Sequence, residues 1–250
     1  MAAQGSWAPD VRRLTGEFVG TAFLLAAVVG SGIMAQTRSD DAGLQLLQNA
    51  FATAGVLVAL ILAFGAVSGA HFNPAVTLTD RWFGGVDTPT TVWYIGAQTA
   101  GSIVGVIAAN LMFDLDAVEW STTDRSTANL LFAEGVATLG LLLVIFGVVR
   151  SGRSTVVAFA VGGYIAGAYY FTSSTSFANP AVTVGRMFSD TFAGIEPASA
   201  PAFIVAQLAA VAIGIGLIRL LWPDIDDVAD EVLAPHVTDR VEDGHDASVL

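Results

Sequence analysis

The chain has 250 residues, of which 54% are hydrophobic and only 13% charged, whereas about 25% of the residues of soluble domains are charged. There is no Cys, so disulfides, thiolate catalysis and thiolate metal sites are excluded, and a net charge of −12 disfavours nucleic-acid binding. The three His residues do not cluster with carboxylates at metal-ligand spacing, so neither a metal site nor a cofactor is expected.

Six apolar stretches are long enough to cross a membrane, since a spanning helix needs about 20 mostly apolar residues. In chain order they cover residues 14–35, 44–67, 92–113, 130–149, 155–171 and 202–222. The first lacks a signal-peptide cleavage site. The stretches run nearly end to end, so the sequence predicts an all-α membrane protein with no sizeable soluble domain.

Two further segments, 69–85 and 173–194, are moderately apolar but too short to cross. Each begins with small or polar residues and then takes on a helical pattern. Irregular backbone survives at membrane depth only where protein buries it or where it lines a wet cavity. These segments are therefore predicted to be half-helices that enter the membrane and turn back.

The same motif opens both half-helices, as "HFNPAVTL" at 71–78 and "SFANPAVTV" at 176–184. Asn is a good N-cap and Pro is favoured at the first helical position, so each motif predicts an abrupt helix start. The residues concerned are Asn73, Pro74, Ala75, Asn179, Pro180 and Ala181.

The two halves of the chain repeat one unit. Glu17 lies in "GEFVGT" and Glu134 in "AEGVAT", each inside an apolar span, and each is followed by a span, an NPAVT segment and a closing span. Because each unit has three spans, 14–120 and 121–222 must face opposite ways, which is an inverted repeat. The two helix starts then meet near the membrane centre, where their positive dipole ends repel protons and cations but let neutral solutes pass.

This double motif resembles the major intrinsic protein family, the aquaporins and aquaglyceroporins, over about residues 11–222. The resemblance implies six spans and two half-helices around a pore in each subunit, and a homotetramer. It places Asn73 and Asn179 at the pore centre, and it makes Glu17 and Glu134 buried acceptors that brace the two loops. The alternative for these Glu residues is a proton relay, because ionisable residues inside spans are functional candidates.

The chain departs from the family pattern at its selectivity filter. Most water-selective members have Arg directly after the second NPA, where this chain has Val182. Counting by the family spacing gives Thr53 and Gly167 as the other filter residues. This set is small and nearly uncharged, and Val in place of Arg resembles the pattern of a bacterial subgroup linked to arsenic handling. It predicts a wide filter that admits water, glycerol, urea, ammonia and metalloid hydroxides such as arsenite.

Three charged or titratable residues are expected near the pore mouths. Arg186 shares a helix face with Asn179 and Val182, so it either lies at the pore mouth one turn further out or pairs with Asp190 on the surface. Asp80 holds the equivalent position in the first unit. His71 is expected to fill the cytoplasmic constriction, with a pH gate as the alternative.

The basic residues predict the orientation. Arg12, Arg13, Arg150 and Arg153 flank the same ends of the spans, so both termini are expected in the cytoplasm of a plasma-membrane protein. Residues 1–13 then form a cytoplasmic N-terminus, and 223–250 an acidic, disordered tail. The acidic, Lys-free composition also fits a halophilic source.

Other functions compete with a wide channel. A strict water channel has the same architecture. A secondary transporter also uses inverted repeats and broken helices, but it needs coupling residues near the midplane, and the spans offer little beyond the two Glu and Gln98. A membrane enzyme is disfavoured, because the spans contain no Ser/His, Cys/His or metal cluster, and no catalytic residue is predicted.

Overall fold

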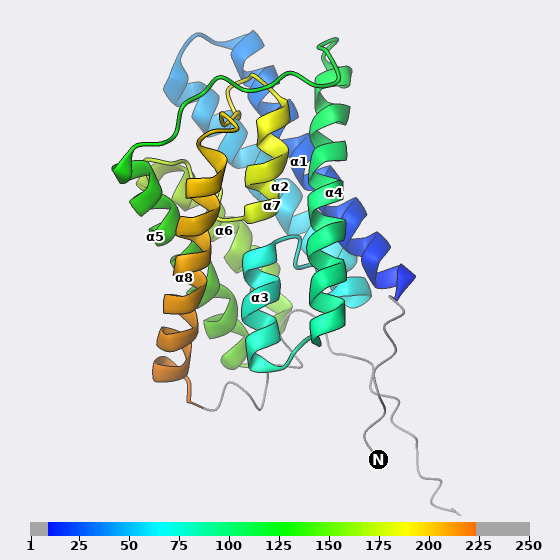
Figure 1. Cartoon of the computed structure of the whole chain (residues 1–250), viewed down its shortest axis with the longest axis vertical. Coiled ribbons are helices and arrows are strands. Elements are labelled where there is room, and N and C mark those ends of the chain that lie inside the picture. Colours follow the sequence, from blue (N-terminus) through cyan, green and yellow to red (C-terminus); the bar gives the residue numbers. More distant parts are fainter. Residues whose placement is uncertain (1–9, 224–250) are drawn as a thin grey trace, which may run out of the picture.

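The computed structural model describes residues 10–223, and all the regular secondary structure in this range is helical (Figure 1). Residues 1–9 and the acidic tail from 224 onward lie outside the described residues. The helices are α1 (Val11–Arg38), α2 (Ala42–Ser68), α3 (Pro74–Phe83), α4 (Thr88–Met112), α5 (Ala128–Arg150), α6 (Val157–Phe171), α7 (Pro180–Gly185) and α8 (Ala200–Leu221). Short 3-10 helices precede α6 (Ser154–Val156) and follow α7 (Arg186–Phe188).

Among the described residues, six helices are long and apolar enough to cross a membrane, which confirms the six predicted spans. Several begin earlier than the apolar stretches do, because a polar residue caps them from outside. The carboxylates of Asp10, Asp41 and Asp87 accept backbone N–H bonds at the starts of α1, α2 and α4. A side-chain cap satisfies N–H groups that a helix start leaves without an intrahelical partner.

The two half-helices α3 and α7 begin at the predicted motifs. Asn73 Oδ1 accepts the N–H of Ala75 at 2.9 Å, and Asn179 Oδ1 accepts that of Ala181 at 3.0 Å. Figure 1 shows α3 and α7 stacked inside the bundle, with their starts facing each other and their far ends pointing to opposite ends of the molecule. Each half-helix therefore begins inside the bundle, whereas an ordinary spanning helix runs from one end of the bundle to the other.

The helices pack as an inverted repeat. In repeat one (α1–α4), α1 packs against α2 and α4; in repeat two (α5–α8), α5 packs against α6 and α8. The repeats meet where α2 packs on α6, and each half-helix also contacts the closing helix of the other repeat, α3 on α8 and α7 on α4. Both half-helices are thereby enclosed by protein from both repeats.

The contact between α1 and α4 depends on two glycines. A Cβ atom at Gly101 would collide with the carbonyl oxygen of Phe18, and one at Gly105 with that of Ala22. Only Gly lets the two helix backbones approach this closely, which is the role that small residues play between membrane helices. The close approach brings Glu17 of α1 and Gln98 of α4 within reach of the same loop.

Candidate pore and its two re-entrant loops

The loop before α3 is held by a buried carboxylate. Glu17 is fully buried, and its Oε1 accepts the backbone N–H of His71 at 3.0 Å and the hydroxyl of Ser68 at 2.6 Å. Its Oε2 accepts the N–H of Phe72 and the side-chain amide of Gln98, both at 2.7 Å. All four partners are donors, so the carboxylate is satisfied in its charged form and stabilises the loop.

The loop before α7 is held in the same way. Glu134 is fully buried; its Oε1 accepts the N–H of Phe177 at 2.8 Å, and its Oε2 accepts the N–H of Ala178 at 2.9 Å. The amide of Gln207 donates to the same Oε2 at 2.8 Å. Both Glu residues therefore lie where bracing requires them, and their oxygens are engaged by donors.

Two glutamines complete these braces, a role that was not predicted from the sequence. Besides the Glu contacts, the amide of Gln98 donates to the hydroxyl of Thr77 and that of Gln207 to the hydroxyl of Thr183, each at 3.0 Å. Each Gln therefore links a closing span to the brace and to the half-helix. The sequence does contain a hint of this role, because the closing span of each repeat carries one Gln in a mostly apolar stretch.

Both loops contain non-glycine residues in the left-handed region. Ala70 and Phe72 have φ of 49° and 50°, and Ser176 and Ala178 have φ of 52° and 49°. Such residues each cost on the order of 1–3 kcal/mol and persist only where their surroundings hold them. The Glu braces supply that restraint, because they bind the backbone N–H groups of Phe72 and Ala178 directly.

The two NPA asparagines join the repeats at the centre. The side-chain amide of Asn73 donates to the carbonyl of Ala178, and that of Asn179 donates to the carbonyl of Phe72, both at 2.8 Å. Each amide has a second N–H. Asn73 and Asn179 both line the cavity described next, so the second N–H groups remain available to a solute there.

A cavity passes beside the meeting point of the half-helices. It touches residues of both loops and of four surrounding helices, and its wall is mostly apolar. The lining residues are Leu24, Val28, Thr53, Leu57, Ile61, Ala70, His71, Phe72, Asn73, Val76, Leu141, Ile145, Val161, Ile165, Tyr169, Ser176, Phe177, Asn179, Val182 and Arg186. The polar side chains in this wall come mostly from the two loops and from Arg186 after α7. The spanning helices add only Thr53 of α2 and Tyr169 of α6 to an otherwise aliphatic surface.

Two of the three expected filter residues line this cavity, and one does not. Thr53 and Val182 are both in its wall. Gly167 is exposed on the outer face of α6, and the position that its Cβ would take has only Phe171 at 4.0 Å. The side chain that α6 presents to the cavity beside Thr53 is Tyr169, whose hydroxyl donates to Thr53 Oγ1 at 3.2 Å. Tyr169 therefore replaces Gly167 in the candidate filter.

At the end of the cavity toward which α3 runs, the structure joins His71 and Asp80. His71 Nε2 lies 3.5 Å from Asp80 Oδ2, and His71 Nδ1 lies 3.0 Å from the hydroxyl of Thr77. Both residues are buried, and His71 alone of the two lines the cavity. Asp80 therefore acts on this end through the His71 ring that it contacts. We call this the Asp80 end.

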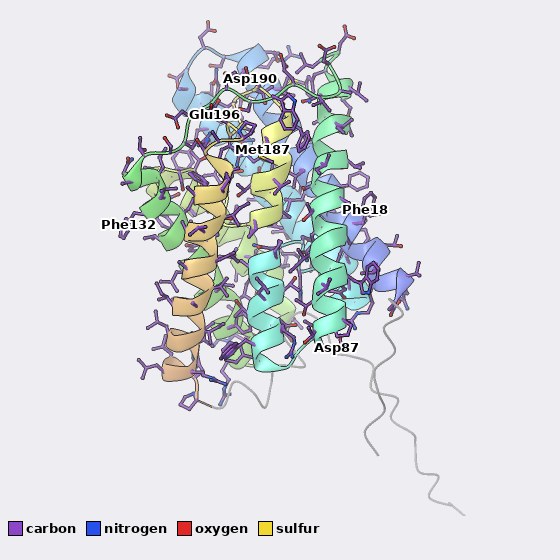
Figure 2. The ribbon with its side chains drawn as sticks, in the orientation of Figure 1. Phe18, Asp87, Phe132, Met187, Asp190 and Glu196 are labelled. Carbon is purple, nitrogen blue, oxygen red and sulfur yellow. The ribbon has the colours of Figure 1, made fainter. Side chains whose placement is uncertain are left out.

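At the opposite end, which we call the Arg186 end, Arg186 is buried and lines the cavity. Its Nε donates to the carbonyl of Ala193, and its Cζ lies 3.4 Å from the centroid of the Phe177 ring. The surface pair with Asp190 is not formed, since Asp190 accepts hydrogen bonds from Thr122 instead. Figure 2 shows Asp190, Glu196 and Met187 at this end of the bundle and Asp87 at the other.

Comparison with known proteins assigns the family. The sequence profile described as "Major intrinsic protein" matches residues 6–156. "Aquaglyceroporin AqpS" of Rhizobium meliloti (strain 1021) is 44% identical over 210 residues, which cover 84% of this chain and 90% of that one. "Glycerol uptake facilitator protein" of Streptococcus pneumoniae (strain ATCC BAA-255 / R6) is 30% identical over 196 residues, covering 70% and 82%.

A solved structure has the same fold. The X-ray structure of the aquaglyceroporin from Plasmodium falciparum superposes with a TM-score of 0.65 at 22% identity, covering 86% of this chain and 98% of that one. The six spans, the paired half-helices, the profile match and the similarity to AqpS lead to one conclusion: this chain belongs to the major intrinsic protein family.

Proposed function

We propose that the protein is a passive membrane channel for small neutral solutes, with a filter wide enough for glycerol, urea and metalloid hydroxides such as arsenite as well as water. The observation that carries the proposal is Val182, a small apolar side chain in the cavity wall directly after the second NPA. A long cationic side chain there would narrow the passage. The names of two relatives, an aquaglyceroporin and a glycerol uptake facilitator, favour the same solute class.

The centre of the cavity is where protons and cations are excluded in this proposal. The starts of α3 and α7 face each other there (Figure 1), and helix starts carry partial positive charge. Asn73 and Asn179 offer N–H donors, which match the oxygen atoms of neutral solutes and repel cations. The aliphatic wall on either side keeps binding weak, so that a solute can leave.

The proposal includes the membrane arrangement. We place the channel domain at 14–222 in the plasma membrane, with both termini in the cytoplasm and four copies in a homotetramer. Support for the orientation comes from Figure 1, in which the start of α1 and the end of α8 lie at the same end of the bundle. We also propose a halophilic source organism, because the chain is acidic and contains no Lys.

Stopped-flow permeability of one vesicle preparation to water, glycerol, urea and arsenite tests the filter. We expect all four to enter faster than in protein-free vesicles, with rates that rise linearly with the gradient. Val182→Arg should reduce glycerol entry by about tenfold while water entry falls less, because the larger solute is more sensitive to width. Entry of water alone would establish the strict water channel, and saturable, gradient-coupled entry would establish a transporter.

A further inference from the structure

A buried arginine, Arg186, and a partly buried one, Arg125, share one aromatic ring at the Arg186 end. Arg186 Cζ lies 3.4 Å from the centroid of Phe177, and Arg125 Cζ, from the loop between α4 and α5, lies 5.0 Å from it. Arg125 Nε donates to the carbonyl of Gly194 at 2.9 Å, next to the carbonyl of Ala193 that binds Arg186. The backbone after α7 thus holds both guanidinium groups in place.

These two positive charges are not neutralised locally. Among residues 10–223, no carboxylate lies within salt-bridge distance of Arg125 or Arg186. Glu134 attracts both electrostatically, but its oxygens are bound by the Phe177 and Ala178 N–H groups and by Gln207. Two cations against one carboxylate leave a net charge of about +1.

The terminal N–H groups of Arg186 have no acceptor among the described residues. Its Nε is engaged by Ala193, whereas its two terminal nitrogens make no hydrogen bond to any of the described residues. A guanidinium carries five N–H donors in a fixed planar fork that fits two oxygen atoms side by side. Because Arg186 lines the cavity, an occupant of the cavity is the available acceptor.

The Ser176 hydroxyl is a second unused donor in the same cavity wall. Ser176 is 3% exposed, and its Oγ has no hydrogen-bond partner within the described part of the chain. Its backbone is fixed, with φ of 52° and its N–H donated to Ser174 Oγ at 3.2 Å. A buried hydroxyl without a partner costs about 1–3 kcal/mol, which an acceptor bound in the cavity would remove.

We propose that the Arg186 end of the cavity is a binding site for a small monovalent oxyanion or carboxylate, held by the Arg186 guanidinium and the Ser176 hydroxyl and attracted also by Arg125. The net charge of about +1 matches one negative charge, and the guanidinium fork matches a planar group with two oxygens. The anion is a blocker and not cargo, because beyond the centre the wall is aliphatic and the Asp80 end carries a buried carboxylate.

The test rests on the proposed function, because it measures the block of solute entry through the same passage. Glycerol-driven swelling is recorded in vesicles that contain the full chain, with equal sodium nitrate inside and outside. Sodium gluconate, the salt of a bulkier anion, replaces nitrate to hold ionic strength constant. We expect about 100 mM nitrate to slow glycerol entry by about tenfold, as for a site with a dissociation constant on the order of 10 mM.

Variants separate the site from a general salt effect, each compared as the ratio of its own rates with and without nitrate. Arg186→Gln and Ser176→Ala should lose most of the nitrate block. Arg38→Gln, which removes an exposed Arg from the end of α1, should keep it. Because Arg186 and Arg125 both donate to backbone carbonyls, Ser176→Ala gives the independent test, since its hydroxyl has no partner among the described residues. Arg125→Gln should weaken the nitrate block by the loss of one nearby charge.

The outcomes distinguish the two proposals. If glycerol does not enter wild-type vesicles faster than empty ones, the proposed function fails. If glycerol enters and nitrate slows it no more than gluconate does, the anion site is refuted and the channel stands. Nitrate block that persists unchanged in Arg186→Gln, Ser176→Ala and Arg125→Gln would also refute the site, since the anion would then act elsewhere.

Discussion

In repeat one, Glu17 binds the loop before α3 and Gln98 ties it to Thr77; in repeat two, Glu134 and Gln207 do the same for the loop before α7. The donors, the acceptors and their order match almost atom for atom. These contacts hold strained backbone inside a low-dielectric environment, where an unpaired polar group is expensive. Both repeats face the same physical requirement, and both meet it with the same residue types.

The two ends of the cavity differ at equivalent positions. His71 and Phe177 both stand two residues before an NPA asparagine, and Asp80 and Arg186 both stand seven residues after one. In repeat one, His71 contacts the carboxylate of Asp80, and the two carry opposite charges when His71 is protonated. In repeat two, the Phe177 ring contacts the guanidinium groups of Arg186 and Arg125. The Glu and Gln residues of the braces are needed for the fold in both repeats, and they are the same in both. The residues at the two cavity ends are not needed to hold the loops, and these are the residues that differ between the repeats.

The largest loss of stability should come from removing a Glu brace, which both repeats contain. Glu17→Gln replaces an acceptor-only carboxylate by an amide whose NH₂ group faces backbone donors. We expect it to lower stability by roughly 3 kcal/mol and the Tm by about 10 °C. Glu134→Gln should do the same to a smaller extent, since Glu134 accepts bonds from Phe177, Ala178 and Gln207 but lacks a serine contact like that of Ser68 with Glu17.

Thermal unfolding in detergent, followed by size-exclusion chromatography, measures this loss. Glu119→Gln is the matched control, because Glu119 is an exposed carboxylate in the loop between α4 and α5. It should leave the Tm unchanged. A Tm for Glu17→Gln as high as that of the control would show that the carboxylates do not brace the loops, and it would reopen their alternative as a proton relay.

A smaller loss of stability is expected from a change at the Arg186 end, where repeat two differs from repeat one. Phe177→Leu removes the ring that faces Arg186 and Arg125, and cation–π contacts are worth about 0.5–2 kcal/mol each. We expect a Tm decrease of about 5 °C. The exposed Phe132, which Figure 2 shows pointing away from the bundle, gives the control Phe132→Leu with no decrease.

A double-mutant cycle separates the ring's attraction for the arginines from its packing. The cost of Phe177→Leu is measured again in a protein that carries Arg125→Gln. If the cation contact contributes, Phe177→Leu costs less in that background, because one of its two cations is already gone. Equal costs in the two backgrounds would assign the whole effect to lost packing volume.

The helices and half-helices were predictable from the sequence because hydropathy and the NPAVT motifs are strong local signals. The face that α6 turns to the cavity was not. In a membrane helix, the lipid-facing and cavity-facing sides are both apolar, so hydrophobic periodicity does not tell them apart. Counting by family spacing selected Gly167, whereas the structure turns Tyr169 inward.

Two other features escaped sequence reasoning for related reasons. Left-handed backbone at Ala70, Phe72 and Ala178 carries no residue-type signal, because only Gly and Asn mark that region of φ and here tertiary hydrogen bonds impose it. Arg125 lies in a loop far from the motifs along the chain, and it reaches Phe177 only because that loop folds across the end of the bundle (Figure 1).

The smallest expected effect tests the corrected filter. Gly167→Ala adds a methyl group on the exposed face of α6, where its nearest neighbour would be Phe171 at 4.0 Å. Stability should change by less than about 1 kcal/mol, the helix-propensity difference between the two residues, and the glycerol-to-water permeability ratio should stay constant.

Tyr169→Phe keeps the ring but removes the hydroxyl that donates to Thr53 in the cavity wall. The variant removes from the cavity wall one hydroxyl that could form a hydrogen bond with glycerol, so glycerol entry should fall by about threefold. Stopped-flow swelling of the two variants side by side decides which residue of α6 contributes to the filter. A changed ratio in Gly167→Ala together with wild-type behaviour in Tyr169→Phe would mean that α6 turns its other face to the passage, and the filter would then have to be rebuilt around that face.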